Sequence, residues 1–463
     1  MHKIAVSNFM ALDEVEVEVK GLTLFLGEQA VGKSTLSKLI YFYRSLKDDF
    51  IDNIIDLAYN DENHGNNQSS FYVSSLWRKI AIKFYNYFGS TRHLSPFTIT
   101  YEYEAEKTLT LGLKEDKSLD INFSKALYQA VVYGDAPNRV QKIKQVSAQR
   151  NTAERRAFQQ ELTSLESLSS KIFNDPYMPL FIPAGRNITV NYSSQFQREF
   201  YGELRHEIGR IKSEGDLSTS MGQKQSADMY LMAQFLDHIY RLIEQFKDKS
   251  LDDLIAEYRS LYEADLNLSL QAIIDRFHKI LKGRYTHDKY GEKIYINQES
   301  YVYLQNASSG QQEAIRILQD AFMIALYQER TFRVIEEPEA HLYPLAQKAL
   351  IEVLAIVLNS TSSQLILTTH SPYILSIVNN LLFAYRVVAK NPMMREQVHE
   401  IVPQEAWLNP ETVAVYFLAE GQCENIFDAE LGLIDQNRLD EISEELGHDF
   451  ERLYDFHSQS FQV

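Results

Sequence analysis

Cysteine is almost absent from this sequence: Cys423 is the only one in 463 residues. A single thiol can form neither an internal disulfide nor a thiolate metal cluster, as expected in a reducing compartment. Long apolar runs are also missing. The densest run, residues 350–358, includes Glu352 and falls well short of the ~20 residues that a membrane helix needs. Four acids within residues 13–18 argue against a signal peptide, so we expect a cytoplasmic protein without a membrane helix.

Basic charge is in short supply as well. The chain has 46 Lys and Arg against 63 Asp and Glu, a net charge of −17. This balance excludes a surface that contacts nucleic acid everywhere, but it permits a local basic patch. The composition is otherwise that of an ordinary globular protein, with 45% apolar residues. The length allows roughly three domains of ~150 residues, and no internal repeat indicates a solenoid or propeller.

Hydrophobic alternation predicts two groups of strands. Residues 14–19 alternate Glu and Val, and Leu22, Leu24 and Leu26 follow, so two strands lead into a glycine-containing loop. A helix is expected over residues 35–46, and residues 60–70 form a polar loop. Three further alternating runs, at 97–103, 109–113 and 119–123, predict an antiparallel meander.

Strand signals end near residues 134–137, and helical spacing replaces them up to residue 172. Between residues 139 and 156 this insertion has a single acid, Glu154, against six basic residues. The six are Arg139, Lys142, Lys144, Arg150, Arg155 and Arg156. We call them the basic patch. They could receive DNA phosphates or an acidic, DNA-mimicking protein; the alternative is an ordinary solvated helix face. A short strand at 180–182 and helices over 225–282 follow.

The sequence G-x-x-x-x-G-K-S stands between the predicted strand and the predicted helix, which is the context of a phosphate-binding loop. Its glycines let backbone amides surround phosphates, Lys33 reaches the terminal phosphates, and the Ser34 hydroxyl suits Mg²⁺. The candidate ATP-binding residues are Gly27, Glu28, Gln29, Ala30, Val31, Gly32, Lys33, Ser34 and Thr35.

A second motif, residues 332–339, is a short apolar strand that ends in paired carboxylates, as a Walker B element does. Glu336 would hold Mg²⁺, directly or through water, and Glu337 would polarise the attacking water as the catalytic base. The alternative for this motif alone is a solvated, glutamate-rich turn.

Two further motifs resemble those of ABC-type ATPases. Ser308, Ser309, Gly310 and Gln311 precede a strong helix and resemble the ABC signature, although alone they would pass for a helix cap. In that family the signature contacts the γ-phosphate of a nucleotide bound to another subunit. His370 ends an apolar strand and resembles the ABC switch histidine, which implies a hydrogen bond to the γ-phosphate.

The resemblance of the four motifs to this family implies an α/β fold: an ABC-type P-loop ATPase head with a mixed sheet, an antiparallel meander and helical insertions. Residues 1–135 would form the N-terminal part of the head, 136–176 the basic insertion, and 177–190 a head strand and loop. Residues 191–283 would be a helical lobe, 284–404 the C-terminal part of the head, and 405–463 a docking or oligomerisation segment. In that last segment, residues 439–453 place leucines and other apolar residues on one helical stripe among acids.

The run from Glu336 to Pro344 resembles the Rad50/RecF/OLD-like group rather than transporters. Two departures stand out. Residues 28–30 read Glu-Gln-Ala where that group usually has Asn-Gly, and residues 181–186 stand where a glutamine-bearing loop is expected. Arg186 in this second stretch is a candidate for sensing phosphate or a neighbouring subunit, with a surface arginine as the alternative.

Glu420 superficially resembles the first acid of a Toprim nuclease, but no Asp-x-Asp pair follows it, so we expect ATP hydrolysis and no nuclease chemistry in this chain. Such a head resembles the AAA15-type ATPase subunits of two-gene bacterial anti-phage modules such as PARIS. The resemblance implies an ATPase that binds ATP and Mg²⁺, assembles with itself, and holds a separately encoded Toprim-type nuclease until it recognises a phage protein. The alternative is a DNA-repair or chromosome-maintenance ATPase of the RecF/Rad50 type that acts directly on DNA.

Overall fold

The computed structural model describes residues 2–59, 68–147, 152–191, 227–262, 268–434 and 452–453. Its centre is an 11-stranded mixed sheet with the order β6-β5-β4-β1-β2-β14-β13-β3-β12-β11-β7. These strands are β1 (His2–Phe9), β2 (Leu12–Val19), β3 (Leu22–Gly27), β4 (Thr98–Glu104), β5 (Lys107–Leu113), β6 (Leu119–Phe123), β7 (Met178–Ile182), β11 (Thr331–Glu336), β12 (Gln364–Thr368), β13 (Val413–Ala419) and β14 (Gln422–Asn425). The mixed sheet and the antiparallel meander that the sequence predicts are therefore present.

The parallel half of the sheet fixes the position of the site. β13, β3, β12, β11 and β7 run parallel to one another, so their carboxyl ends meet at one edge. β3 ends there at Gly27 and β11 at Glu336. Ligands in open α/β sheets bind outside the carboxyl ends of the strands. The topology thus brings the phosphate-binding loop, the Walker B acids and His370 to the same edge.

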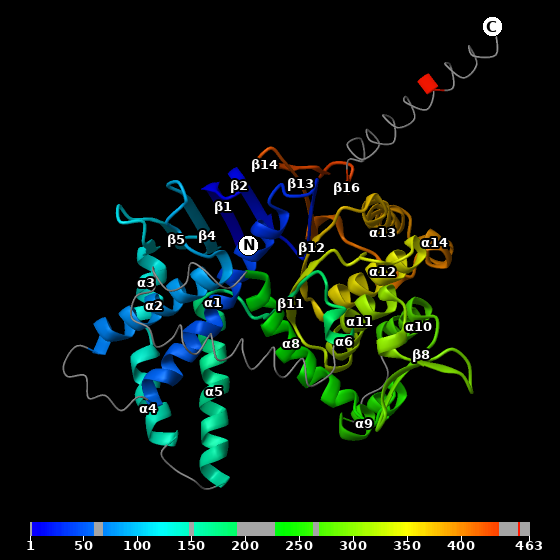
Figure 1. Ribbon diagram of the computed structural model, residues 1–463, viewed down its shortest axis with the longest axis horizontal. Helices are drawn as coiled ribbons and strands as arrows, with labels where there is room; N and C mark the ends of the chain where they lie inside the picture. The colour runs from blue at the N-terminus through cyan, green and yellow to red at the C-terminus, as the bar shows by residue number, and fades with distance from the viewer. Residues whose placement is uncertain are drawn as a thin grey trace.

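Helices cover both faces of the sheet (Figure 1). On one face lie α1 (Lys33–Tyr59), α2 (Gln68–Phe88), α3 (Lys125–Val132), α4 (Ala136–Ser147) and α5 (Thr152–Ile172). The other face packs against a group that includes α8 (Ala227–Phe246), α9 (Leu251–Tyr262), α10 (Leu268–Leu281), α11 (Ser309–Tyr327), α12 (Pro344–Thr361) and α13 (Pro372–Lys390). Alternation along β3 serves both layers, since Leu24 packs into the second group and Phe25 into the first.

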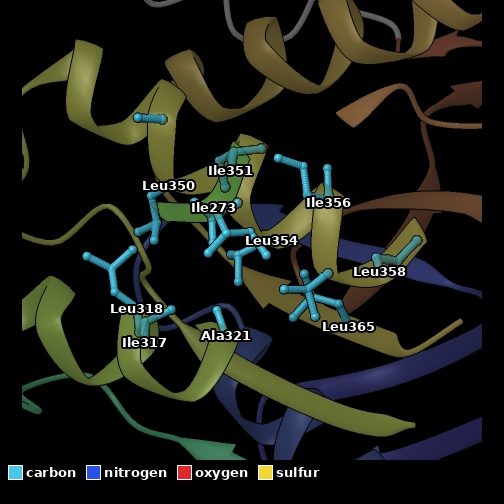
Figure 2. Packing of buried hydrophobic residues seen from close by; sticks show 14 of the residues in the cluster. Ile273, Ile317, Leu318, Ala321, Leu350, Ile351, Leu354, Ile356, Leu358 and Leu365 are labelled. Atoms are coloured by element: carbon cyan, nitrogen blue, oxygen red, sulfur yellow. The ribbon is translucent and has the colours of Figure 1, made fainter. Parts of the chain in front are cut away.

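The second group of helices packs around an apolar interior. Figure 2 shows side chains from α10, α11, α12 and β12 meeting there, among them Ile273, Leu318, Leu354 and Leu365. Full burial of each such side chain contributes about 1.5–3 kcal/mol. This interior supports α11 and α12, the helices that follow the signature and Walker B motifs.

α13 is, within the described ranges, the one helix whose length and apolar composition would allow it to cross a membrane. Its apolar side is already used, because Ile374, Val378 and Leu382 are buried in the second group. Packing within the head therefore accounts for its composition.

Several elements lie outside the sequence expectations. β1 and α2 were not anticipated, and α1 extends to Tyr59 instead of ending near residue 46. β13 inserts between β3 and β14, so residues 413–425 of the segment 405–463 are part of the head sheet. The predicted apolar stripe at 439–453 lies almost wholly outside the described residues. A separate three-stranded sheet comprises β8 (Arg284–Asp288), β9 (Gly291–Tyr295) and β10 (Tyr301–Tyr303).

In its described residues, the basic insertion contains two helices, α4 and α5, that pack against each other. Within it, Arg139 forms ion pairs with Asp135 (2.7 Å) and Glu161 (2.6 Å), which join the two helices. Lys142, Lys144 and Arg156 are exposed. Arg150 and the side chain of Arg155 lie outside the described residues. Arg139 thus has a structural task in addition to any role in the basic patch.

Candidate functional site

The lysine of the phosphate-binding loop forms hydrogen bonds with the backbone of the same loop. Lys33, the first residue of α1, is buried, and its ammonium donates hydrogen bonds to the carbonyls of Gly27 (2.8 Å) and Glu28. Burial lowers the pKa of Lys33, while nearby acids, Glu337 foremost, act in the opposite direction. The ammonium is therefore held at the mouth of the loop, where it faces the acids at the end of β11.

Two positions in the loop require glycine. A Cβ at Gly27 would lie 2.2 Å from the carbonyl oxygen of Leu418, and a Cβ at Gly32 would lie 2.5 Å from Leu12 Cδ2. Both glycines also have positive φ, +140° and +100°. Ala30 has φ +65°, a left-handed conformation that costs an alanine about 1–2 kcal/mol. This strain gives a physical reason for the glycine that the resembling group usually has near this position.

Glu336 is the last residue of β11, and only one of its two carboxylate oxygens accepts a hydrogen bond from the described residues. Its Oε2 accepts a hydrogen bond from the Ala184 amide at 3.4 Å. Oε1 is buried and has no hydrogen-bond partner among the described residues. A buried carboxylate oxygen without a donor is costly in a protein interior. Such an oxygen is suited to bind a cation. The Ser34 hydroxyl and the Glu336 carboxylate are the groups that would hold Mg²⁺ next to nucleotide phosphates.

No group of three or more histidine, cysteine or acidic side chains in the described part of the chain could hold a metal ion by itself. When bound, Mg²⁺ supplies neutralisation of phosphate charge.

Glu337 and His370 come together from adjacent strand ends. His370 Nε2 lies 3.7 Å from Glu337 Oε1, and the two side chains keep exposed fractions of 33% and 45%. The Glu337 backbone has φ +42°, and its amide donates to the carbonyl of Thr368 at 2.9 Å. The bond ties the residue after β11 to the last residue of β12, and the Glu337 side chain remains accessible to water, as a general base must be.

Glu339, the last residue of the motif at 332–339, belongs to the site although the sequence predicts no role for it. Its Oε1 accepts hydrogen bonds from Thr369 Oγ1 (2.5 Å) and from the His370 amide (3.1 Å). Its Oε2 is buried and lacks a hydrogen-bond partner among the described residues. Glu339 thus fixes the loop that carries His370. The third position after Glu336 in the Glu-Glu-Pro-Glu run was the available signal.

Arg186 is fully buried, so the alternative of a surface arginine is wrong. Its guanidinium donates to the carbonyls of Glu336 (2.9 Å), Glu337 (3.0 Å) and Glu313 (3.1 Å). It also lies 3.3 Å from Glu313 Oε2. Burial lowers the pKa of Arg186, and Glu313 opposes that shift most strongly. The side chain therefore positions the backbone beneath both Walker B acids, which indicates a positioning task rather than direct phosphate sensing.

The signature residues begin α11 with a complete capping box. Ser308 and Gln311 exchange hydrogen bonds, with Ser308 N donating to Gln311 Oε1 at 3.0 Å. Gln311 Nε2 also donates to the carbonyl of Leu281 at 2.6 Å, which anchors the cap to α10. A Cβ at Gly310 would lie 2.6 Å from the carbonyl oxygen of His341, so the signature lies against the chain that follows Walker B. Ser308 and Ser309 remain exposed.

Comparison with solved structures finds distant likenesses. A crystal structure of the SmcHead bound to the C-winged helix domain of ScpA is 10% identical, with 92% of this chain and 96% of that chain covered and a TM-score of 0.38. The SMC head domain from Thermotoga maritima is 9% identical, with coverages of 92% and 97% and a TM-score of 0.33. The recombination mediator protein RecF-ATPrS of the RecFOR pathway is 11% identical, with coverages of 92% and 97% and a TM-score of 0.32.

No curated protein matches the chain. The family model described as an AAA ATPase domain matches residues 1–375, most of the sequence. This match covers the phosphate-binding loop, the Walker B acids and His370, which the fold gathers around the carboxyl ends of β3, β11 and β12. It also covers the signature at the start of α11. The chain therefore belongs to the family of AAA ATPase domains.

Proposed function

We propose that ATP joins two copies of this chain, with Lys33 of one copy and Ser308 of the other contacting the same triphosphate. The pairing of Glu337 with His370 beside the phosphate-binding loop is the observation that carries the catalytic part of the proposal. The exposure of Ser308 and Ser309 at the start of a 19-residue helix supports the contact between copies.

In this proposal the residues have distinct tasks. Lys33 and the loop amides bind phosphate oxygens, and Ser34 and Glu336 hold Mg²⁺. Glu337 accepts a proton from the attacking water, and His370 bonds the γ-phosphate, so that the site distinguishes ATP from ADP. Hydrolysis then weakens the contact between copies and resets the assembly.

Replacing Glu337 with Gln tests the assignment. We expect hydrolysis to fall by about 10²–10⁴-fold, because the amide cannot accept the proton, while ATP binding persists and the ATP-bound assembly accumulates. Phosphate release and nucleotide titration measure the two effects. Glu244→Gln, an exposed glutamate on α8, is the matched control. A normal hydrolysis rate for Glu337→Gln would show that another group is the base.

The cellular role we propose is that of a cytoplasmic sensor and switch in a bacterial anti-phage complex, which holds and then releases a separately encoded Toprim-type nuclease. The resemblance of the ATPase head to the AAA15-type subunits of such two-gene modules supports it. An acidic phage protein would trigger release at the exposed part of the basic patch, which includes Lys142 and Arg156.

Affinity purification of the tagged chain from its native cells tests this role. We expect a co-purifying nuclease that leaves after phage infection. Metal-dependent plasmid nicking by the chain alone would contradict the separate effector. Strongly salt-dependent DNA binding by the isolated chain would instead favour the RecF/Rad50-type alternative.

A further inference from the structure

The three-stranded sheet β8–β10 presents a cluster of tyrosines on its outer face. In its register, Tyr301 lies opposite Tyr295, and Tyr303 lies opposite Lys293. The alternate positions, Tyr285 and Ile294, are buried against the second group of helices. The sheet lies at the lower right edge of the molecule in Figure 1. We call Tyr290, Tyr295, Tyr301 and Tyr303 the tyrosine surface.

Lys293 holds the rings of this surface in place. Its ammonium lies 4.4 Å from the ring centre of Tyr301, 5.3 Å from that of Tyr303 and 5.2 Å from that of Tyr290. Asp288 pairs with the same ammonium at 2.7 Å. Tyr290 and Tyr301 nevertheless keep exposed fractions of 67% and 41%. Rings ordered in advance lose little entropy on association, and tyrosine is enriched in protein interfaces.

The tyrosine surface is rigidly tied to the signature helix. Only five residue steps separate Tyr303 from Ser308, at most about 18 Å of chain. Gln312 of α11 donates to the carbonyls of Leu304 (3.2 Å) and Gln305 (3.0 Å) in the connecting turn. Arg316 of α11 forms a two-pronged ion pair with Glu292 of β9, at 2.6 and 2.7 Å. The sheet must therefore move with Ser308.

We propose that the tyrosine surface packs against a second copy of this chain when Ser308 meets that copy's nucleotide. The inference rests on the proposed function, which places Ser308 at the contact between copies. The short, rigid connection then carries the tyrosine surface to the same interface.

Charge favours a second copy as the occupant. Each copy has a net charge of −17, so two copies repel each other. The tyrosine surface is bordered by basic side chains that are exposed to solvent: Lys282, Arg284 and Lys289. The neighbouring acids Asp288 and Glu292 are already paired with Lys293 and Arg316, whereas Glu299 in the β9–β10 turn is exposed. The surface is thus a locally basic region suited to an acidic neighbour.

Sedimentation velocity of the full chain tests the inference. The Glu337→Gln background with ATP and Mg²⁺ supplies the assembly, and Tyr290→Ala with Tyr301→Ala is added to it. We expect the dissociation constant of the assembly to rise at least about tenfold, because exposed aromatic anchors dominate interfaces. ATP binding should not change. Tyr59→Ala with Tyr133→Ala, which removes two other exposed tyrosines, is the matched control.

Lys289→Glu gives a second readout that removes no ring, and it should also weaken the assembly, since it reverses charge at the border of the surface. If Glu337→Gln does not assemble with ATP at all, the proposed function fails and the inference with it. If it assembles and both sets of variants assemble equally tightly, the inference alone is overturned. Unchanged assembly with lost binding of a fluorescent single-stranded oligonucleotide would assign the tyrosine surface to nucleic acid instead.

Discussion

Charged side chains are buried both at the end of β11 and near the beginning of β12. The charges near β12 are paired within the protein, whereas the acids at the end of β11 are only partly hydrogen-bonded. Near the beginning of β12, Arg44 pairs with Asp175 through two hydrogen bonds of 2.5 and 2.9 Å and with Gln364 at 2.7 Å. Lys47 lies 3.5 Å from the same carboxylate. At the end of β11, Glu336 and Glu339 each keep a buried oxygen without a hydrogen-bond partner among the described residues.

We interpret the group around Asp175 as a structural ion pair and the acids at the end of β11 as a site that can bind a ligand. Burial opposes the charge of Asp175, but Arg44 and Lys47 outweigh it, so that its pKa lies below the usual range. The protein itself satisfies that charge. At the end of β11, Arg186 instead bonds backbone carbonyls and leaves the carboxylates to other partners. Buried carboxylates without a hydrogen-bond or ionic partner destabilise the folded protein unless a bound cation pairs with them.

Glu336→Gln should have the largest effect among the variants that test this difference. We expect Mg²⁺-dependent hydrolysis to fall by about a thousandfold, since loss of a metal ligand removes several kcal/mol of transition-state stabilisation. Without nucleotide, the free energy of unfolding should stay the same or rise, because the variant removes a buried charge that the protein does not pair. Chemical denaturation and phosphate release measure both. A clear loss of stability without nucleotide would mean that Glu336 is a structural residue.

Asp175→Asn should show the reverse pattern. Removing the charge leaves Arg44 buried without its counterion, so we expect the free energy of unfolding to fall by about 3 kcal/mol. ATP affinity should persist, since Arg44 contacts the first residue of β12 and the nucleotide site lies at its other end. Urea denaturation and nucleotide titration report the two quantities. Asp56→Asn, which removes an exposed partner of Lys79, is the control and should cost less than about 1 kcal/mol. Equal losses in both variants would contradict this view of Asp175.

His2, which lies close to the charge of Arg44, should make the free energy of unfolding depend on pH, and this is the smallest of the expected effects. Burial foremost, and then the charge of Arg44, lower the pKa of His2 to about 4. The unfolded chain therefore binds a proton near its ordinary pKa of ~6.5 while the folded chain does not, and stability falls as pH drops from about 6.5 to about 4. Between pH 7 and pH 5 we expect a loss of about 2 kcal/mol. His2→Gln should flatten that part of the profile in urea denaturation. An unchanged slope would place the pH response elsewhere.

The sequence located the strand ends that carry the motifs better than it predicted the elements around them. The glycine loop, the acids at 336–337 and the histidine at 370 are short-range patterns, since each depends on a strand end and the next few residues. Alternation likewise predicted the meander, which the structure places at β4, β5 and β6. It did not reveal β1 or α2. β13 was grouped with a docking segment because the pairing partner of a strand is not encoded in its own period.

The sequence by itself determined which residues could bind phosphate, hold a cation and move a proton, because those abilities belong to side-chain chemistry and local spacing. Only the tertiary structure decided that Arg186, distant from both acids along the chain, supports the backbone of Glu336 and Glu337. It alone placed Glu339 under His370 and tied the tyrosine surface to Ser308. The reason is that parallel strands bring their ends together only after β7, β11 and β12 have paired, and no local pattern specifies that order.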